Sequence, residues 1–367
     1  MAPVPTVLDD TLLDDPARLA EADTGGLLRA AAMAGAQVRA TAEAAAELEL
    51  SDRLDLGRPR AFVLLSRPGV SRSVIRLLAA LFAPSCPVPV VVSDFVPSWI
   101  GALDVVFGHT DDPGDHELAA SLERAARYGA TVVLSGPEDG PIAASVAGKG
   151  MLLAPRVPVP SEFAFPRALA AGLLTANSLG LLVADVESLA DRLDAEAERD
   201  HLAHESFVNP AKTLALRLSG KLPLLWGLDQ VAAAVGAHGA FALATHAATV
   251  CDVADYHQAL VRPALRHAAV ASTSERDIFA DPEDEPAGAR PKVVLLSVRS
   301  GPVYRAERNR AEDLFSGAEV LAPADEIEAD EPALAGLLAL RFELAALYLG
   351  LAAGSIGGAG RYAPVTA

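Results

Sequence analysis

Residues 61–82 read AFVLLSRPGVSRSVIRLLAALF. The apolar run at 61–65 predicts a buried strand, and apolar residues recurring at helical spacing through residue 82 predict a helix. The linking residues 66–73 hold three serines, two arginines, one proline and one glycine. A short buried strand that passes through such a loop into an amphipathic helix is typical of α/β proteins with a parallel sheet.

Short apolar strands and helices alternate on both sides of this stretch. An alanine-rich helical segment at 16–50 precedes it. Further strands are predicted at 87–93, 103–107, 130–134 and 151–154, and further helices at 115–128, 142–147 and 169–183. The charged residues 187–205 are interpreted as a helical connector to a second half.

The second half resumes the alternation. Its helices are predicted at 210–218, 230–238, 304–315 and 332–351, its strands at 222–226, 292–298 and 319–321, an element of either kind at 241–250, and an acidic, proline-containing loop at 275–291. The sequence therefore predicts an α/β fold of two tandem three-layer sandwiches, each a parallel sheet flanked by helices, in domains 1–186 and 187–367.

Composition excludes several classes of protein. Of the 367 residues 51% are apolar, which excludes general disorder, and 48 acids against 30 bases leave a net charge of −18, which opposes binding to nucleic acid or an anionic membrane. The uncharged stretches at 168–184 and 231–251 are interpreted as buried core elements rather than membrane spans. The two cysteines are far apart, and residues 1–15 carry acids where a secretory signal needs bases, so a cytoplasmic location is expected.

The loop after the first strand has the chemistry of a phosphate cradle. Ser66, Ser71 and Ser73 supply hydroxyls, Gly69 allows close backbone approach, and the helix that follows presents its N-terminal amides. The loop has neither the GxGxxG spacing of dinucleotide-binding proteins nor the GxxxxGK[ST] spacing of nucleotide-triphosphate sites. The alternative is an ordinary turn capped by a serine, with Arg67 in solvent.

Several short motifs resemble the bifunctional phosphoglucose/phosphomannose isomerases, which contain two sugar-isomerase (SIS) domains. Residues 87–94 (PVPVVVSD) and 99–101 (WIG) resemble the first domain, and residues 165–169 (FPRAL) match the family's Pro-Arg motif. Residues 209–212 (NPAK) and 220–223 (GKLP) resemble the start of the second domain, and 256–258 (YHQ) lie near the family's catalytic histidine. The resemblance covers residues 60–350 in coarse order and is closest to divergent actinobacterial members.

The resemblance implies interconversion of glucose 6-phosphate or mannose 6-phosphate with fructose 6-phosphate through an enediolate. Arg167 would stabilise the enediolate, and His257 would move a proton during ring opening. The family's activity requires no metal or other cofactor, and its histidine reaches the partner's pocket in some members, which implies a homodimer. The resemblance also implies a phosphorylated sugar as the ligand of this chain.

The chain departs from the family pattern at the second phosphate loop. Residues 108–117 read GHTDDPGDHE, where the family is rich in serine, threonine and glycine. Thr110 remains a candidate phosphate ligand, but the four carboxylates of this loop would repel a phosphate. Asp115 and Glu117 are predicted to be the N-cap and a first-turn charge of the next helix. Metal binding by this loop is the alternative, although its His and Asp residues follow no recognised ligand spacing.

The catalytic base is the next departure. The family has a glutamate upstream of its histidine, whereas residues 244–248 here read ATHAA, so His246 becomes the candidate base because imidazole titrates near neutrality. A core histidine is the alternative. The C-terminal lysine of the family is also missing, and Arg361 cannot replace it in proton transfer.

The retained residues also have structural interpretations. Arg167 can pair with Glu162 at the surface, and His257 can be a simple helix-start residue. Three hypotheses follow: an isomerase with a degenerate, rebuilt site, a non-catalytic sugar-phosphate-binding or regulatory protein, and a protein acting on another phosphosugar such as an amino or acylated sugar.

Overall fold

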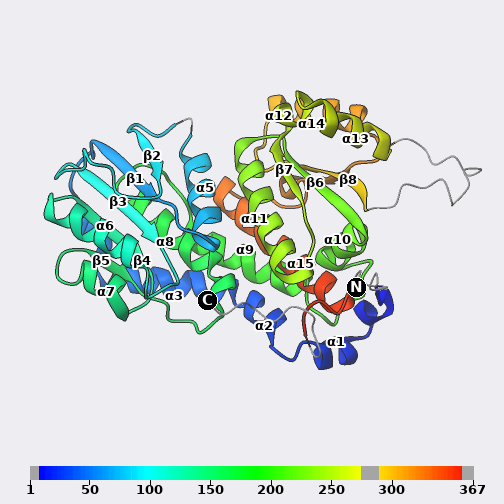
Figure 1. Cartoon of the computed structure of the whole chain (residues 1–367), viewed down its shortest axis with the longest axis horizontal. Helices are drawn as coiled ribbons and strands as arrows, with labels where there is room; N and C mark the ends of the chain where they lie inside the picture. The colour runs from blue at the N-terminus through cyan, green and yellow to red at the C-terminus, as the bar shows by residue number, and fades with distance from the viewer. Residues whose placement is uncertain (1–7, 84, 274–288, 358–367) are drawn as a thin grey trace, which may run out of the picture. The chain divides into compact units, whose positions relative to one another are not determined.

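The computed structural model describes residues 8–83, 85–273 and 289–357. The chain forms two compact units. Figure 1 shows their helices and strands in colours that run from blue at the N-terminus to red at the C-terminus. The five-stranded unit is Ala30–Ala195, and the four-stranded unit joins the described residues of Met1–Arg29 to those of Glu196–Ala367. The division lies inside helix α9 (Val186–Arg199), between Ala195 and Glu196, whereas the expected boundary is 186/187 with the N-terminal segment in the first domain.

The five-stranded unit has a parallel sheet in the order β2-β1-β3-β4-β5. Its strands are β1 (Ala61–Leu65), β2 (Val90–Ser93), β3 (Asp104–His109), β4 (Thr131–Ser135) and β5 (Met151–Leu153). Its other elements are α3 (Ala34–Glu47), α4 (Leu50–Arg53), α5 (Val70–Phe82), α6 (His116–Arg127), α7 (Gly140–Val146), η2 (Ser161–Phe163) and α8 (Phe165–Ser178).

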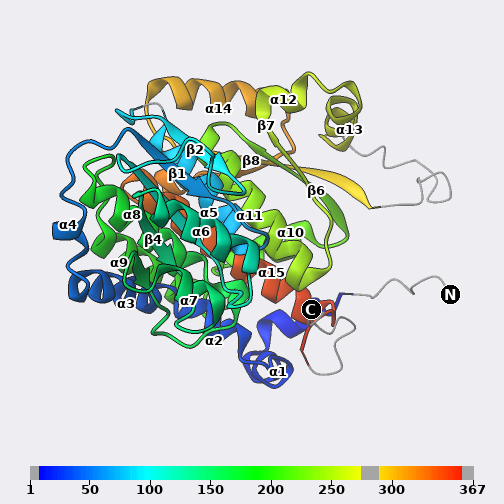
Figure 2. The same ribbon diagram turned by 60° about the vertical axis from the view of Figure 1, so that its left-hand side comes forward.

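Helices cover both faces of this sheet (Figure 2). Because strand side chains alternate, Val63 and Leu65 of β1 join one buried cluster with Leu118 and Leu122 of α6. Phe62 points to the opposite face, where its ring meets Phe82 of α5 edge-on at 5.5 Å. The chain leaves β1 and β3 toward opposite faces, and such a switch point leaves a crevice at the carboxyl ends of the strands.

The four-stranded unit repeats this topology in the order β7-β6-β8-β9. Its strands are β6 (Lys221–Gly227), β7 (Asp252–Asp255), β8 (Arg290–Leu296) and β9 (Glu319–Leu321). Its helices are α10 (Pro210–Leu218), α11 (Gln230–Ala247), α12 (Tyr256–Leu260), α13 (Pro263–Thr273), α14 (Pro302–Leu314), η4 (Pro323–Asp325) and α15 (Glu331–Ala352), together with η1 (Asp10–Asp14), α1 (Pro16–Ala22) and the start of α2 (Leu27–Ala32).

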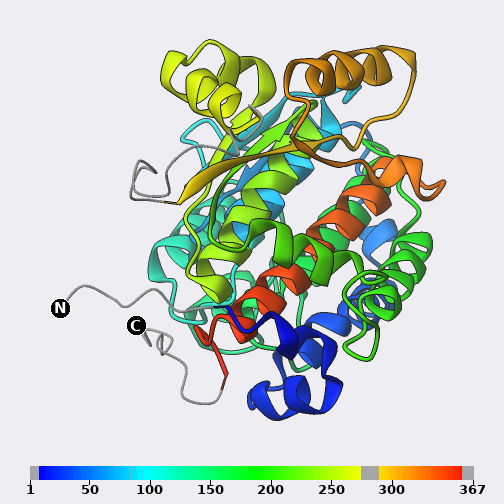
Figure 3. The same ribbon diagram turned by 90° about the vertical axis from the view of Figure 1, so that its right-hand side faces the viewer.

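Helix α15 forms the core of the four-stranded unit (Figure 3, red-orange). It packs against α10 and α11, and Gly239 of α11 lets the two helices approach closely, because a Cβ there would come within 2.7 Å of the Phe342 ring. In the described part of the chain it is the one helix long and apolar enough to cross a membrane, and its apolar window is entirely buried inside the protein. A helix that is apolar and buried on all sides is typical of a protein core.

The N-terminal segment is fastened to the four-stranded unit by polar contacts. The ammonium group of Lys212 is buried and donates to the carbonyl oxygens of Leu13 at 2.5 Å, Leu202 at 2.8 Å and His204 at 2.6 Å. At the other end of the segment, the N–H of Asp9 donates to the carbonyl of Ala352 at 3.0 Å. These bonds tie the first described residues to α10 and to the end of α15.

The predicted fold of two sandwiches with parallel sheets is confirmed, with local differences. Residues 230–238 and much of 241–250 form one helix, α11, rather than two elements. Strand β7 and helix α13 were not predicted, whereas α12, which begins at Tyr256, agrees with the interpretation of His257 as a helix-start residue. The acidic loop expected at 275–291 falls mostly outside the described residues.

Candidate functional site

The loop between β1 and α5 places its polar groups at the carboxyl edge of the five-stranded sheet. Gly69 is the N-cap of α5 with φ 78°, and no side chain caps this helix. Ser66 and Ser71 are buried, and the Ser71 hydroxyl accepts the backbone N–H of Arg67 at 3.1 Å. An uncapped helix start presents unpaired N–H groups and partial positive charge, which favours an anion. Ser73 is buried in the first turn of α5.

Arg67 of this loop is held by the neighbouring loop, which connects β3 to α6. Its Nε donates to Asp115 Oδ2 at 2.6 Å and its Nη2 to Asp115 Oδ1 at 2.9 Å. Asp115 also accepts the N–H of Leu118, so its predicted role as the N-cap of α6 is confirmed. The guanidinium lies 5.6 Å from the Phe95 ring, and the side chain is only 13% exposed. Arg67 is therefore not a solvated arginine.

Arg167 lies in the first turn of α8, where Pro166 is favourable at the helix start. The side chain is buried, and its Nη2 donates to Asp111 Oδ1 of the β3–α6 loop. Its buried Nε has no hydrogen-bond partner among the described residues. Burial lowers the pKa of Arg167 to about 10, so the guanidinium stays charged at neutral pH. Its partner is Asp111 rather than the expected alternative, Glu162.

Asp111 also contacts His109, which extends a polar chain to the end of β4. His109 Nε2 lies 3.1 Å from Asp111 Oδ2, and Nδ1 lies 3.0 Å from the Ser135 carbonyl oxygen and 3.1 Å from the Ser135 hydroxyl. Burial and the charge of Arg167 lower the pKa of His109 to about 3, so the ring is neutral. A neutral ring can donate from Nε2 to Asp111 and accept at Nδ1 from the Ser135 hydroxyl. The Ser135 carbonyl is independently satisfied by the N–H of Thr110 at 3.1 Å.

The starts of α5 and α8 lie at the same edge of the sheet, because α5 follows the end of β1 and Arg167 of α8 bonds Asp111 just after the end of β3. The helices pack together at mid-length, where a Cβ on Gly172 would come within 2.3 Å of Leu78. Gly172 is five residues beyond Arg167, and Leu78 is seven residues beyond Ser71. Five predicted site residues, Ser66, Gly69, Ser71, Thr110 and Arg167, therefore belong to loops and helix starts at the carboxyl edge of one sheet.

The two candidate catalytic histidines lie in the other unit, at opposite edges of its sheet. His246 is near the end of α11, sixteen residues and thus about 24 Å beyond the helix start at Gln230. It is buried, and burial together with the charge of His238 lowers its pKa to about 4. His257 follows β7 at the carboxyl edge, its side chain is 67% exposed, and its Nε2 lies 3.5 Å from Glu307. The structure does not bring these histidines together.

The residues missed by sequence reasoning are the partners of the two arginines. Sequence reasoning treated Asp111 and Asp115 as charges that repel phosphate, Asp115 also as a helix N-cap, and His109 as part of the metal alternative, and it gave Ser135 no role. One signal was available, since the acidic residues of 108–117 follow a strand adjacent to the one that carries Arg67. Across the described residues, no group of three or more His, Cys, Asp or Glu side chains has the geometry to hold a metal ion.

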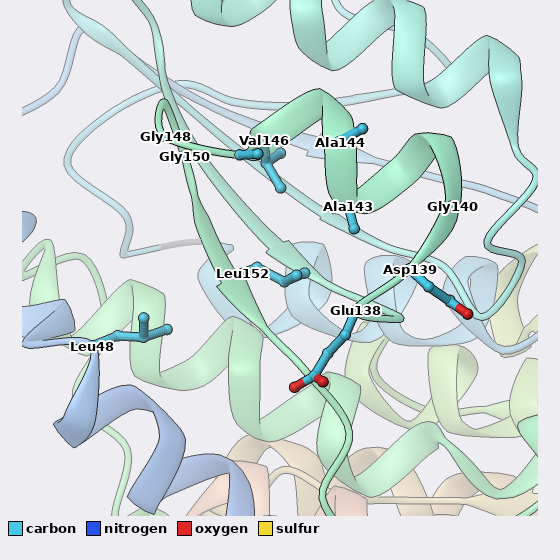
Figure 4. Close-up of a pocket in the computed structure, with 11 residues that line it drawn as sticks. Leu48, Glu138, Asp139, Gly140, Ala143, Ala144, Val146, Gly148, Gly150 and Leu152 are labelled. Carbon is cyan, nitrogen blue, oxygen red and sulfur yellow. The ribbon is translucent and has the colours of Figure 1, made fainter.

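A cavity of about 550 Å³ lies elsewhere in the five-stranded unit, beside α7 and β5 (Figure 4). Small and apolar residues line most of it, among them Ala143, Gly150 and Leu152. The carboxylates of Glu138 and Asp139 stand at its rim, and no arginine or lysine lines it. This cavity contains none of the predicted site residues and lacks the cations that an anionic ligand needs.

Solved structures share this fold. No protein-family model and no curated protein matches the chain. A "putative phosphosugar isomerase" from Silicibacter pomeroyi matches with TM-score 0.58 and 15% identity over 89% of this chain and 97% of its own. A second "putative phosphosugar isomerase", from Bacillus subtilis, matches with TM-score 0.56 and 14% identity over 85% of this chain and 94% of its own. The C-terminal domain of glucosamine-fructose-6-phosphate aminotransferase from Francisella tularensis matches with TM-score 0.62 and 10% identity over 89% and 96%.

Proposed function

We propose that this protein binds a phosphorylated sugar at the carboxyl edge of its five-stranded sheet. The phosphate would take the amides at the start of α5 with Ser66, Ser71 and Arg67, and Arg167 would face the sugar. The observation that carries this proposal is the buried Arg167 with an unpartnered Nε, at the same sheet edge as an uncapped helix start. The similarity to solved phosphosugar isomerases supports the class of ligand.

Isomerisation of the bound sugar is the second candidate function, of the kind catalysed by phosphoglucose/phosphomannose isomerases. Arg167 favours it, because a buried guanidinium is suited to stabilising an enediolate. The candidate proton-transfer groups favour binding without turnover. The His109 ring is neutral, and its two nitrogens contact Asp111 and Ser135. His246 lies at the far end of α11. His257 remains the candidate for ring opening, and a cytoplasmic homodimer belongs to the same proposal.

Thermal unfolding with and without ligand tests the binding proposal. Glucose 6-phosphate, mannose 6-phosphate or fructose 6-phosphate should raise the melting temperature, whereas the unphosphorylated sugars should not. A ligand at one hundred times its Kd stabilises the folded state by about 2.7 kcal/mol. Arg67→Met should reduce the shift, and Arg76→Met, which changes an exposed arginine of α5 nine residues further along the chain, should leave it intact.

Turnover separates the two candidates. Conversion of fructose 6-phosphate to its glucose or mannose isomer, lost in Arg167→Met, supports the isomerase. Stabilisation without conversion supports a binding protein. If no phosphosugar stabilises the wild-type chain at millimolar concentration, the proposed function is contradicted.

A further inference from the structure

Arg67 and Arg167, the two arginines proposed to meet the ligand, are each paired with a carboxylate from the same short loop. Asp115 accepts two hydrogen bonds from Arg67, whose Nη2 also lies 3.5 Å from Glu117 Oε2, and Asp111 accepts one from Arg167. Both carboxylates come from the β3–α6 connection, whereas the arginines come from the β1–α5 loop and the start of α8. The loop therefore occupies the cations that would attract a phosphate or an enediolate.

The charge count leaves no excess cation for a ligand that binds beside the loop. Residues 110–117 contain four carboxylates, whereas Arg67, Arg167 and the exposed Arg72 at the start of α5 supply three positive charges. A phosphate monoester carries nearly two negative charges at neutral pH. An anionic ligand must therefore take the place of Asp111 or Asp115 on an arginine rather than add to the existing pairs.

Among the described residues, Asp111 leaves one donor of Arg167 without a partner, so a ligand with more acceptor oxygens could replace this carboxylate. Asp111 uses one oxygen for Arg167 Nη2 and the other for His109, so the buried Nε is left without a partner. A phosphate or carboxylate ligand can accept from Nε and Nη2 together, which is the stronger, bidentate arrangement. The unpartnered donor thus points to a ligand with more acceptor oxygens than Asp111 offers.

The loop itself is anchored independently of the arginines. The Thr110 hydroxyl accepts the N–H of Asp112, and the Asp112 carboxylate accepts the N–H of Gly114. The Pro113 carbonyl accepts the N–H of Ile142 at 3.4 Å. Thr110, a candidate phosphate ligand, thus also supports the loop through its hydroxyl. These anchors let Asp111 release its arginine while the rest of the loop keeps its place.

We propose that Asp111 and Asp115 are internal competitors of the anionic ligand, so that the β3–α6 loop sets the affinity of this site by occupying Arg167 and Arg67. This inference rests on the proposed function, because it concerns the same site. It assigns the acidic loop a role in ligand affinity rather than only in capping α6. Loss of either carboxylate charge should make binding tighter.

The experiment measures binding of inorganic phosphate and of fructose 6-phosphate to the full chain by calorimetry. Asp111→Asn and Asp115→Asn keep the shape of the side chain, and asparagine remains a good N-cap at position 115. Each should bind both anions roughly tenfold more tightly than wild type, since a hydrogen bond to a charged partner is lost from the competing state. Arg167→Met added to Asp111→Asn should remove the gain.

Asp112→Asn is the matched control. It removes the same charge from the same loop, and Asp112 forms no ion pair within the described residues. A gain in Asp111→Asn and Asp115→Asn but not in Asp112→Asn supports the proposal. Equal gains in all three variants, or weaker binding in Asp111→Asn and Asp115→Asn, overturn it while the proposed function stands. Absence of binding in wild type and in every variant overturns the proposed function and this inference with it.

Discussion

His246 couples folding to pH through its burial. Its pKa in the folded protein is about 4, below the reference value of 6.5, mainly because burial disfavours the charged ring. Below pH 6.5 the unfolded chain binds this proton and the folded chain does not. Stability from this residue is therefore fully present above pH 6.5 and is lost as the pH falls toward 4, by up to about 1.4 kcal/mol per pH unit.

The first prediction follows from that linkage. In His246→Gln, the free energy of unfolding should fall less steeply between pH 6.5 and pH 4.5 than it does in wild type. Urea titrations at several pH values give the slope. Thr245→Ala changes an exposed side chain with no titratable group on the same helix and should leave the slope unchanged. An identical slope in His246→Gln and wild type would contradict the assignment.

Lys212 gives the second prediction at this scale. Lys212→Met should lower the free energy of unfolding by about 3 kcal/mol, because three backbone carbonyls would lose the donor that now satisfies them. Lys221→Met, at an exposed position, should change stability by no more than about 0.5 kcal/mol. Chemical denaturation of both variants measures the difference. Equal stability of the two variants would show that the buried ammonium contributes nothing.

Individual elements depend on a few close approaches of backbone. Gly227 ends β6 where α11 crosses it, and a Cβ there would lie 2.2 Å from the backbone nitrogen of Ala233. Gly227→Ala should therefore push α11 off the strand and cost about 3 kcal/mol, at the upper end for overpacking. Gly101→Ala meets only an arginine side chain at 3.9 Å and serves as the control. Thermal unfolding distinguishes them, and similar melting temperatures would refute the steric argument.

The elements that sequence predicted well are those whose own residues decide their state. The apolar run of β1 and the Asn209 cap before α10 give their observed bounds. Strand β7 was missed because its four residues include two aspartates and no apolar run, and its pairing with β6 makes it a strand. Beyond His238, α11 continues as a helix because α15 packs along it, a long-range contact that local propensity does not contain.

At the scale of the whole molecule, the N-terminal segment completes the four-stranded unit. Removal of residues 1–15 deletes the Leu13 carbonyl that Lys212 binds and the Asp14 carboxylate that accepts from Ser206. Amides of α10 and α15 should then exchange faster with solvent, whereas those of β1 and β3 should not change. Hydrogen exchange measures both sets. A chain lacking only residues 1–7 is the control, and equal effects throughout the protein would contradict the prediction.

The candidate site shows where sequence reasoning ends for the molecule as a whole. The α5 loop was singled out because a strand, a loop and a helix start are local patterns, and Arg167 was singled out because residues 165–169 resemble the Pro-Arg motif of a known family. The pairing of Arg167 with Asp111 spans 56 positions and depends on which strands are neighbours. From sequence alone, a carboxylate near a phosphate loop is expected to repel the phosphate. Its arginine partner becomes known only when the order of the strands in the sheet is known.

The hydrogen bond between Asp9 and Ala352 joins residues 343 positions apart, so it can form only after almost all of the described chain has been synthesised. A ribosome adds about 5–20 residues per second, so the first residues wait on the order of tens of seconds for the helix they join. The five-stranded unit, made from one continuous stretch, can fold during that interval. The opening segment cannot complete its contacts until the last long helix has been synthesised.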